Sequence, residues 1–394
     1  MEQAFWQDIA DRILQKERAV AARNAGKIPY TAKDGVFDDM AETNLCWWTN
    51  GFYAGLLWQL YGWSREEIFR SAAEKIEEQL DQNLLSAQGM DHDSGFKWLL
   101  TSVASYRLTG SEASKNRALL AANDLAGRFN LAGGFLRAWN DGGDGRTAGW
   151  AIIDCMMNLP LLEWASKELH DPRFSHIARR HADTAKSAFV REDGSVCHIV
   201  VFDPESGKRL FSLGGQGYAH GSSWTRGQAW ALYGFTLSYL HTKEESYLET
   251  AEKVARHFLA HIPESGLIPA DFDQPPEPKW EDSSAAAIAA CGLIELWKAT
   301  GNEAYLNGAE RLLQALIENR CCFSPERDEL LENGTVAYHD AEHHIPLIYG
   351  DYFFTEAVLK LIGKQTFLYI PLIYGDYFFT EAVLKLIGKQ TFLW

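Results

Sequence analysis

Several features that would identify a membrane or metal protein are missing from this sequence of 394 residues. No stretch approaches the roughly 20 apolar residues that a helix needs to cross a bilayer. The first residues carry neither the basic start nor the apolar run of a secretory signal. The six cysteines show no CxxC pair and no zinc-type spacing. We therefore expect a protein that binds no metal, does not enter a membrane and resides in a reducing cytoplasm.

Positive charge is also scarce. Lysine and arginine together number 37 against 53 aspartate and glutamate, which gives a net charge of −16. A nucleic-acid-binding protein needs clustered basic residues, so this balance argues against a nucleic-acid partner. An anionic ligand would need a locally positive pocket within a negative field.

Apolar and aromatic residues are abundant instead. The sequence is 46% hydrophobic and contains 14 tryptophans. This composition predicts a globular protein with a large core. Tryptophan faces are suited to binding sugars, but composition alone favours tryptophan as a core filler.

A short phrase recurs along the chain, in which an aromatic residue is followed four positions later by alanine. Residues four apart lie on one face of a helix, so each copy predicts an amphipathic helix that packs through this stripe. A weaker copy centres on Ala118, and Phe5 with Ile9 takes the same role in the opening helix. The full copies are Phe69/Ala73, Phe174/Ala178, Tyr247/Ala251 and Tyr305/Ala309.

Six more apolar segments alternate with these six amphipathic helices. A helix that is apolar on most faces is buried. The alternation predicts an all-α fold, an (α/α)6 barrel of six outer and six inner helices. The segment 196–207 predicts a small β-hairpin insertion. The expected inner helices lie near 51–62, 96–109, 149–168, 226–241, 284–300 and 350–362.

The C-terminus contains an internal duplication. Residues 345–368 recur without change at 370–393. A closed barrel has room for one final inner helix, so we expect one copy to complete the ring. We assign 1–369 to a single barrel domain and interpret 370–394 as a surplus duplicate of 345–369.

The segments that enter the inner helices carry the polar residues. If these helices run alike, the segments meet at one end of the ring, where converging polar groups define a candidate site. Asp154 lies within the apolar run 151–157, where an unpaired carboxylate is costly. Asp93 lies about one helix pair earlier, and two nearby carboxylates push their pKa values apart, so that one stays protonated as a general acid. The structural alternatives are a helix cap for Asp93 and a buried hydrogen bond for Asp154. Pro160 predicts a kink near Met156.

Arg226 lies between Trp224 and Trp230. Arginine recognises carboxylates and tryptophan offers a stacking face, so this segment is a candidate uronate site. The structural alternative is a salt bridge beneath a core tryptophan. Neither 142–145 nor His343-His344 carries a phosphate-loop or metal-site pattern.

Five phrases together resemble unsaturated glucuronyl hydrolases, glycoside hydrolase family 88, over about residues 40–363. The nearest related family, the unsaturated rhamnogalacturonyl hydrolases, shares the fold. The phrases are DHDSGF (91–96), AIIDCMMNLPLLEWA (151–165), GSSWTRGQAWALYGF (221–235), DFDQPPEPKWEDSSAAAIAACGLIEL (271–296) and YGDYFFTEAVLKL (349–361).

The resemblance implies a hydrolase that removes a 4,5-unsaturated uronic acid from the non-reducing end of small oligosaccharides made by polysaccharide lyases. It implies that Asp154 is the acid/base and Asp93 its catalytic partner, without a cofactor, in a monomer or homodimer. Alternatives are an unsaturated rhamnogalacturonyl hydrolase acting on pectin fragments, a sugar epimerase and a non-catalytic sugar-binding barrel. The implied substrate contacts are Trp48, Trp139, His198, Gln216, Trp224, Arg226 and Trp230.

Overall fold

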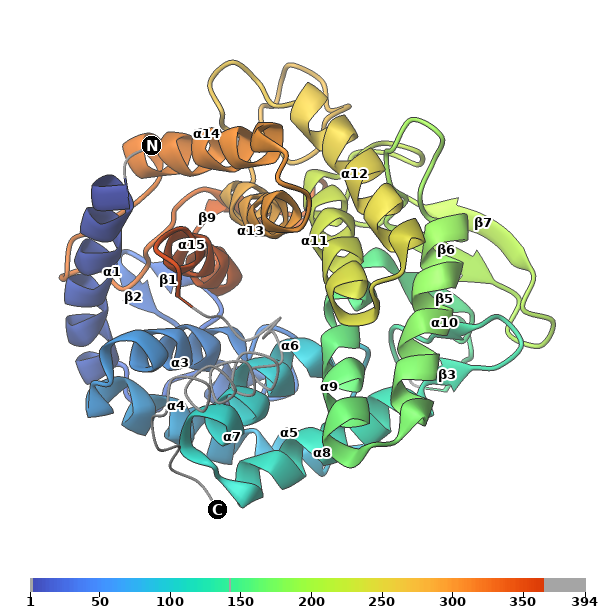
Figure 1. Cartoon of the computed structure of the whole chain (residues 1–394), viewed down its shortest axis with the longest axis horizontal. Coiled ribbons are helices and arrows are strands. Elements are labelled where there is room, and N and C mark those ends of the chain that lie inside the picture. Colours follow the sequence, from blue (N-terminus) through green and yellow to red (C-terminus); the bar gives the residue numbers. More distant parts are fainter. Residues whose placement is uncertain (1–2, 142, 365–394) are drawn as a thin grey trace, which may run out of the picture.

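The computed structural model describes residues 3–141 and 143–364, and within them the helices form a double ring (Figure 1). Six helices with one buried stripe form the outer ring. Both members of the phrases at Phe69 and Tyr247 are buried, which confirms the amphipathic prediction. The outer helices are α1 (Gln3–Arg23), α4 (Glu67–Gln79), α8 (Glu112–Gly127), α10 (Pro172–Ala188), α12 (Glu245–Ala260) and α14 (Glu303–Asn319).

The inner ring consists of six more apolar segments of the described chain, which confirms the (α/α)6 barrel. Four inner segments are nearly continuous helices whose residues are almost all buried. The second and third inner segments are broken into shorter pieces. The inner segments are α3 (Phe52–Ser64), α6 (Ser94–Trp98) with the π-turn η1 (Leu99–Val103) and α7 (Ala104–Thr109), η2 (Ile153–Met157) with α9 (Leu159–Leu169), α11 (Thr225–Thr242), α13 (Ser283–Thr300) and α15 (Ile348–Leu361).

The ring closes between the two ends of the described chain. The last inner helix, α15, packs against α13 on one side and against α3 and α1 on the other (Figure 1). Helix α15 belongs to the first copy of the duplicated segment. The second copy, 370–394, lies outside the described residues, so the boundary of the domain at residue 369 stays a prediction.

The predicted inner helix over 149–168 is wrong in its first half. Residues Trp150–Ile152 form a strand, β5, and Asp154 lies in the following 3-10 turn η2. Pro160 lies in the first turn of α9, where a missing amide hydrogen costs nothing. The predicted kink near Met156 is therefore absent, because the α-helix begins only after that residue.

The predicted hairpin insertion is present and is larger than expected. Strand β6 (Ile199–Phe202) pairs with β7 (Arg209–Leu213) on one side and with β5 on the other, both antiparallel. This sheet protrudes from the ring beside α10 (Figure 1). Its register places Ile152 opposite Ile199 and so brings the loop before β6 to the turn that carries Asp154.

The remaining short elements connect the helices. Within the described residues, no helix is both long and apolar enough to span a membrane. The connecting elements are β1 (Ala32–Lys33), β2 (Val36–Phe37), α2 (Met40–Thr43), α5 (Asp81–Leu84), β3 (Phe129–Asn130), β4 (Phe135–Leu136), β8 (Gly334–Thr335) and β9 (His343–Ile345).

Candidate active site

A cavity of about 580 Å³ lies among the segments that precede the inner helices. It is open to solvent, and its lining residues come from separate stretches of the chain between Asn44 and Glu342. The expectation that these segments converge on one site is met for four of the six, whereas the segments 281–284 and 349–352 do not line the cavity. Six of the nine candidate residues line it, namely Trp48, Asp93, Trp139, Asp154, Gln216 and Arg226.

The two candidate catalytic carboxylates are neighbours, joined through Asn158. The Asn158 amide Nδ2 donates to Asp93 Oδ1 at 3.2 Å and to the Asp154 backbone oxygen at 3.3 Å. The amide oxygen of Asn158 accepts the backbone N–H of Phe96 at 2.7 Å and so satisfies an exposed donor at the start of α6. One buried side chain thus links the Asp93 carboxylate and the backbone of Asp154 to the same helix terminus.

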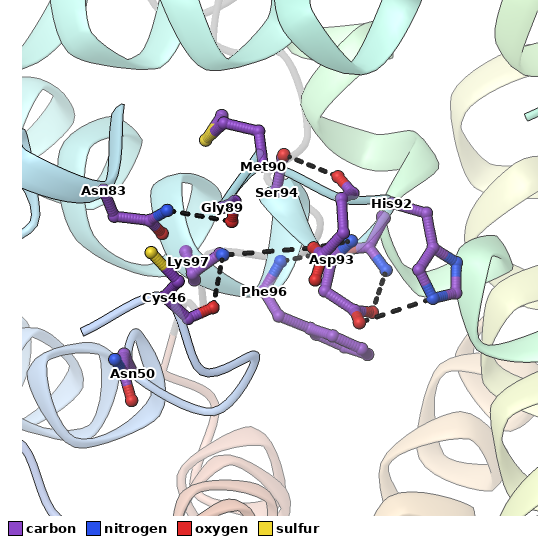
Figure 2. Close-up of polar contacts among 12 residues, drawn as sticks. Cys46, Asn50, Asn83, Gly89, Met90, His92, Asp93, Ser94, Phe96 and Lys97 are labelled. Carbon is purple, nitrogen blue, oxygen red and sulfur yellow. Dashed lines mark hydrogen bonds and ion pairs between the residues drawn. The ribbon is translucent and has the colours of Figure 1, made fainter. Parts of the chain in front are cut away.

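Asp93 belongs to a tightly bonded loop. Figure 2 shows the His92 ring beside the Asp93 carboxylate, with 3.3 Å between Nε2 and Oδ2. The buried Lys97 ammonium donates to the Cys46 carbonyl oxygen at 3.3 Å and so ties this loop to the segment that carries Trp48 (Figure 2). Asp93 precedes α6, but its side chain makes no capping bond. Asp93 therefore occupies the N-cap position expected in the structural alternative, but its carboxylate does not cap the helix.

Burial and charge give Asp154 an unusual proton affinity. Burial raises the pKa of Asp154 to about 7, and the Asp93 carboxylate adds to the increase, whereas His92 and Arg226 oppose it. The Asp154 side chain retains 17% of its exposed surface, which faces the cavity. Its buried Oδ1 has no hydrogen-bond partner among the described residues. Asp154 is thus suited to hold a proton near neutral pH and to release it to a bound molecule.

His198 faces Asp154 from the β-sheet insertion. The backbone N–H of Ile153 donates to the His198 carbonyl oxygen at 3.1 Å, which places the histidine beside Asp154. The His198 ring Nδ1 accepts the backbone N–H of Gln216 at 3.0 Å, so the ring proton is on Nε2, 3.8 Å from Asp154 Oδ1. Burial, with the nearby Arg226 charge, lowers the pKa of His198 to about 3. This histidine is therefore a neutral donor at working pH.

The loop around Gly215 is shaped by that histidine. Gly215 has φ +58°, and a Cβ atom at this position would lie 2.0 Å from His198 Nδ1. Only glycine allows this approach. The loop carries Gln216, whose side-chain amide donates to the Val336 carbonyl oxygen at 3.0 Å.

Arg226 is buried and paired. Its guanidinium forms an ion pair with Asp282, the residue that caps α13, and donates to the Thr335 carbonyl oxygen at 2.6 Å. It lies 4.7 Å from the centre of the Trp224 ring. The structural alternative, a salt bridge beneath a tryptophan, is thus present. Arg226 also lines the cavity, so the two interpretations are compatible.

The tryptophans take different positions. Trp48 and the half-exposed Trp139 line the cavity. Trp224 is almost fully buried against His198, with ring centres 4.2 Å apart. Trp230 has no exposed surface and packs on Phe96 beneath the site. The cavity is therefore not lined by Trp224, His198 or Trp230. Trp230 packs on Phe96, which in turn packs on the lining residue Trp48.

Several residues that line or support the site were not among the candidates, and the buried Asn158 is one that supports it. Asn158 could have been identified from the sequence, because it is a polar residue four positions after Asp154 at the end of the same apolar run. His92 is adjacent to Asp93 in the sequence. The exposed Asp340 and Glu342 line the mouth, and they had no such signal because nothing in the sequence places their loop near the other segments.

A carboxylate pair under aromatic walls, in an open cavity of an (α/α)6 barrel, defines a carbohydrate-active enzyme of the helical-barrel type. The sequence signature of Glycosyl Hydrolase Family 88 matches residues 20–361. The chain belongs to this family. It is therefore a glycoside hydrolase of the unsaturated glucuronyl hydrolase type.

Named relatives agree with this assignment. The unsaturated glucuronyl hydrolase of Bacillus sp. (strain GL1) is 37% identical over 80% of this chain and 86% of its own length. The unsaturated chondroitin disaccharide hydrolase of Streptococcus pneumoniae (strain ATCC BAA-255 / R6) is 33% identical over 83% of this chain and 84% of its own. A solved structure of UGL with dGlcA-Glc-Rha-Glc has a TM-score of 0.87 at 32% identity, covering 92% of this chain and 99% of that one.

Proposed function

We propose that this enzyme hydrates the C4=C5 double bond of a terminal unsaturated uronic acid and thereby releases that sugar from lyase-generated oligosaccharides. The observation that carries the proposal is the state of Asp154, a carboxyl group that lines an open cavity, has a pKa of about 7 and keeps its buried Oδ1 without a hydrogen-bond partner among the described residues. Such a group suits a reaction that needs an acid and then a base at one position. The named relatives support the substrate class.

The reaction proceeds in balanced steps. Protonated Asp154 gives its proton to C4, and positive charge develops at C5, where the ring oxygen stabilises it. The Asp154 carboxylate then takes a proton from a water molecule as the water oxygen bonds to C5. The resulting hemiketal opens the ring at C5, and the exposed hemiacetal at C1 collapses to release the shortened sugar. Asp154 ends protonated, ready for the next turnover.

The surrounding residues take supporting roles in this proposal. Ionised Asp93 keeps the proton on Asp154 until the double bond arrives, because two adjacent negative charges repel each other. The Arg226 guanidinium, which lines the cavity, supplies positive charge for the uronate group, and His198 acts from behind Asp154. Trp48 and Trp139 offer faces to the sugar rings, and Gln216 borders the same cavity.

The test uses the ultraviolet absorbance of the conjugated ene-carboxylate. Wild-type enzyme bleaches it when mixed with a lyase-made unsaturated disaccharide, and Asp154→Asn bleaches it about 100-fold or more slowly, the typical contribution of a general acid. Asp340→Asn, which makes the same change at the cavity mouth, is the control. Equal rates for wild type and Asp154→Asn would contradict the role of Asp154. Binding without bleaching by wild type would favour a sugar-binding barrel instead.

The substrate choice is tested by comparison. We propose that glucuronyl disaccharides from glycosaminoglycans or similar polymers are cleaved faster than unsaturated rhamnogalacturonyl disaccharides. The reverse order would favour the pectin-directed alternative. We also propose a cytoplasmic location, supported by the six cysteines, all of which are free thiols. Sedimentation of the purified enzyme distinguishes monomer from homodimer.

A further inference from the structure

The exposed cavity residue Trp139 lies in a segment without regular secondary structure. Residues 137–140 follow β4 and belong to neither a helix nor a strand, and Trp139 is 37% exposed. The Thr147 hydroxyl donates to the Trp139 carbonyl oxygen at 2.9 Å, and the Ala138 N–H donates to the Trp150 carbonyl oxygen at 2.9 Å. A ring that offers its face to a ligand binds better when it is already held in place. The other bonds that hold this segment therefore influence the affinity of the cavity.

A single arginine bonds to this segment on both sides of Trp139. Arg128 lies at the C-terminal end of α8. Its Nε donates to the Arg137 carbonyl oxygen at 2.9 Å, and its Nη2 donates to the Ala138 carbonyl oxygen at 3.0 Å. Its Nη1 donates to the side-chain oxygen of Asn140 at 3.2 Å. The guanidinium is planar and its donors point in fixed directions, so these bonds position the backbone before Trp139 and the side chain after it.

The same group of bonds ties the segment 137–140 to the loop 88–91, which also lines the cavity. Arg128 Nη1 donates to the Met90 carbonyl oxygen at 3.0 Å. The Asn140 amide nitrogen donates to the Met90 carbonyl oxygen at 2.8 Å and to that of Gln88 at 3.1 Å. Met90 is buried, so the acceptor that both side chains share is fixed in the core. Arg128 thus connects two separate loops of the cavity wall.

We propose that Arg128 is a positioning residue that holds the Trp139 ring in the orientation that a bound sugar requires. This inference rests on the proposed function, because it gives Trp139 a sugar ring to contact. Arg128 does not line the cavity, so it acts through Trp139 and does not touch the substrate. Asn158 holds the Asp93 carboxylate and the Asp154 backbone through bonds that do not involve Arg128. Loss of the arginine therefore weakens binding more than it slows proton transfer.

The geometry of Arg128 can be tested apart from its charge. Asp91 and Asp124 lie close enough to attract the guanidinium, so a neutral substitution would remove an electrostatic interaction as well as the hydrogen bonds. Lysine keeps the positive charge but offers one nitrogen in place of three. Arg128→Lys therefore removes the fork that bonds to both loops and leaves the net charge unchanged.

The first experiment measures KM and kcat of Arg128→Lys by bleaching of a lyase-made unsaturated disaccharide. We expect KM to rise about five- to 20-fold, because several hydrogen bonds that preorganise the cavity wall are lost. We expect kcat to stay within about twofold of wild type, the pattern of a change in binding alone. Arg117→Lys is the matched control. Arg117 lies on the same helix and donates to Asp81 at 2.6 and 2.8 Å, but neither residue lines the cavity, so the control should keep the wild-type KM.

A double variant tests whether Arg128 acts through the tryptophan. Trp139→Ala removes the ring itself and should raise KM at least as much as Arg128→Lys does. If the arginine serves only to position this ring, adding Arg128→Lys to Trp139→Ala should raise KM no further. Residues that act through one another give such non-additive effects, whereas independent residues give additive ones.

The outcomes separate this inference from the proposed function. A wild-type enzyme that does not bleach the unsaturated disaccharide contradicts the proposed function, whatever the Arg128 variants do. If wild type bleaches it, a wild-type KM in Arg128→Lys overturns the inference, and so does additivity with Trp139→Ala. A fall in kcat as large as the rise in KM, or an Arg128→Lys protein without a cooperative unfolding transition, also overturns it, because the arginine would then support the whole fold and not the cavity wall.

Discussion

The side chain of Asn158 donates a hydrogen bond to the Asp93 carboxylate, with 3.2 Å between Nδ2 and Oδ1. The same nitrogen also reaches the Asp154 backbone oxygen. Asn158→Ala removes both bonds and also the acceptor of the Phe96 N–H, and we expect kcat to fall about 10- to 100-fold, chiefly because a hydrogen bond to a charged group is lost. The measurement is the rate of bleaching of the unsaturated disaccharide.

Asn123→Ala is the matched control for Asn158. Asn123 also donates to the carbonyl oxygen four residues earlier, at 2.8 Å, but it lies on the outer helix α8. It should retain wild-type kcat. A similar loss in both variants would show that the helical bond, and not the contact with Asp93, is what matters.

The pH profile should report the proton on Asp154. Its pKa of about 7 means that the acid form required for the first step predominates below neutrality, so kcat/KM should fall as pH rises above about 7. The pKa of His198, about 3, lies outside this range. His198→Asn should therefore lower the rate but keep the basic limb near pH 7. Disappearance of this limb in the variant would mean that His198 is the group that titrates.

Asp154 should reduce stability at neutral pH. Its pKa is raised from the usual 3.8 to about 7 in the folded protein, so the stability due to its protonated form is present below pH 4 and is lost as pH rises to 7. Asparagine cannot ionise, so the Asp154→Asn variant does not lose stability in this way as pH rises. Relative to wild type, the variant should gain about 2–4 kcal/mol in the free energy of unfolding between pH 4 and pH 8.

Chemical denaturation at the two pH values measures this gain. Asp340→Asn, at an exposed position, shows how much of any difference is due to removal of a negative charge in general. If the difference in the free energy of unfolding between Asp154→Asn and wild type is the same at pH 4 and pH 8, ionisation of the buried carboxyl does not destabilise the fold.

Gly215 should not tolerate a side chain. Gly215→Ala combines a positive φ with a Cβ atom 2.0 Å from His198 Nδ1, so we expect a loss of about 1–3 kcal/mol in the free energy of unfolding and a higher KM. Gly221→Ala is the control, because Gly221 also has positive φ, +86°, but no atom lies within 4 Å of the new Cβ. If both variants lose the same stability and keep the wild-type KM, the contact with His198 is unimportant.

The cavity mouth should disfavour sulfated sugars. The exposed Asp340 and Glu342 line it, and the only lysine or arginine among the described lining residues is the buried, paired Arg226. An additional anion beside two carboxylates is repelled. We expect kcat/KM for a sulfated unsaturated disaccharide to be lower than for its unsulfated counterpart, and the double variant Asp340→Asn/Glu342→Gln to narrow the difference. A preference for the sulfated sugar would contradict this electrostatic argument.

Helix periodicity was a sufficient guide to the architecture because each outer helix must bury one stripe. Phe69 and Ala73 illustrate this. Two residues four positions apart lie on the same face of a helix, and in an outer helix of the ring this face is the buried one. The proximity of Asp93 and Asp154 was predictable for a related reason. Both precede inner helices, and adjacent hairpins of a barrel place such segments side by side.

Contacts set by long-range pairing were not predictable. Ile152 reads as part of a helix, but pairing with Ile199 in the sheet outweighs its local preference. The complete burial of Trp230 depends on how Phe96 packs above it, and no local pattern distinguishes a tryptophan that faces a ligand from one that supports the floor. The bridging position of Asn158 depends on the same kind of packing between distant segments.

The packing of α15 against both α13 and α3 has a consequence for synthesis of the chain. The last inner helix also carries Tyr349, whose buried ring packs 5.0 Å from the ring of Trp48, a residue that lines the cavity. A nascent chain that has emerged only as far as α14 leaves the inner faces of its neighbours open to water. A polypeptide that ends before α15 therefore lacks the helix that fills the apolar groove between α13 and α3.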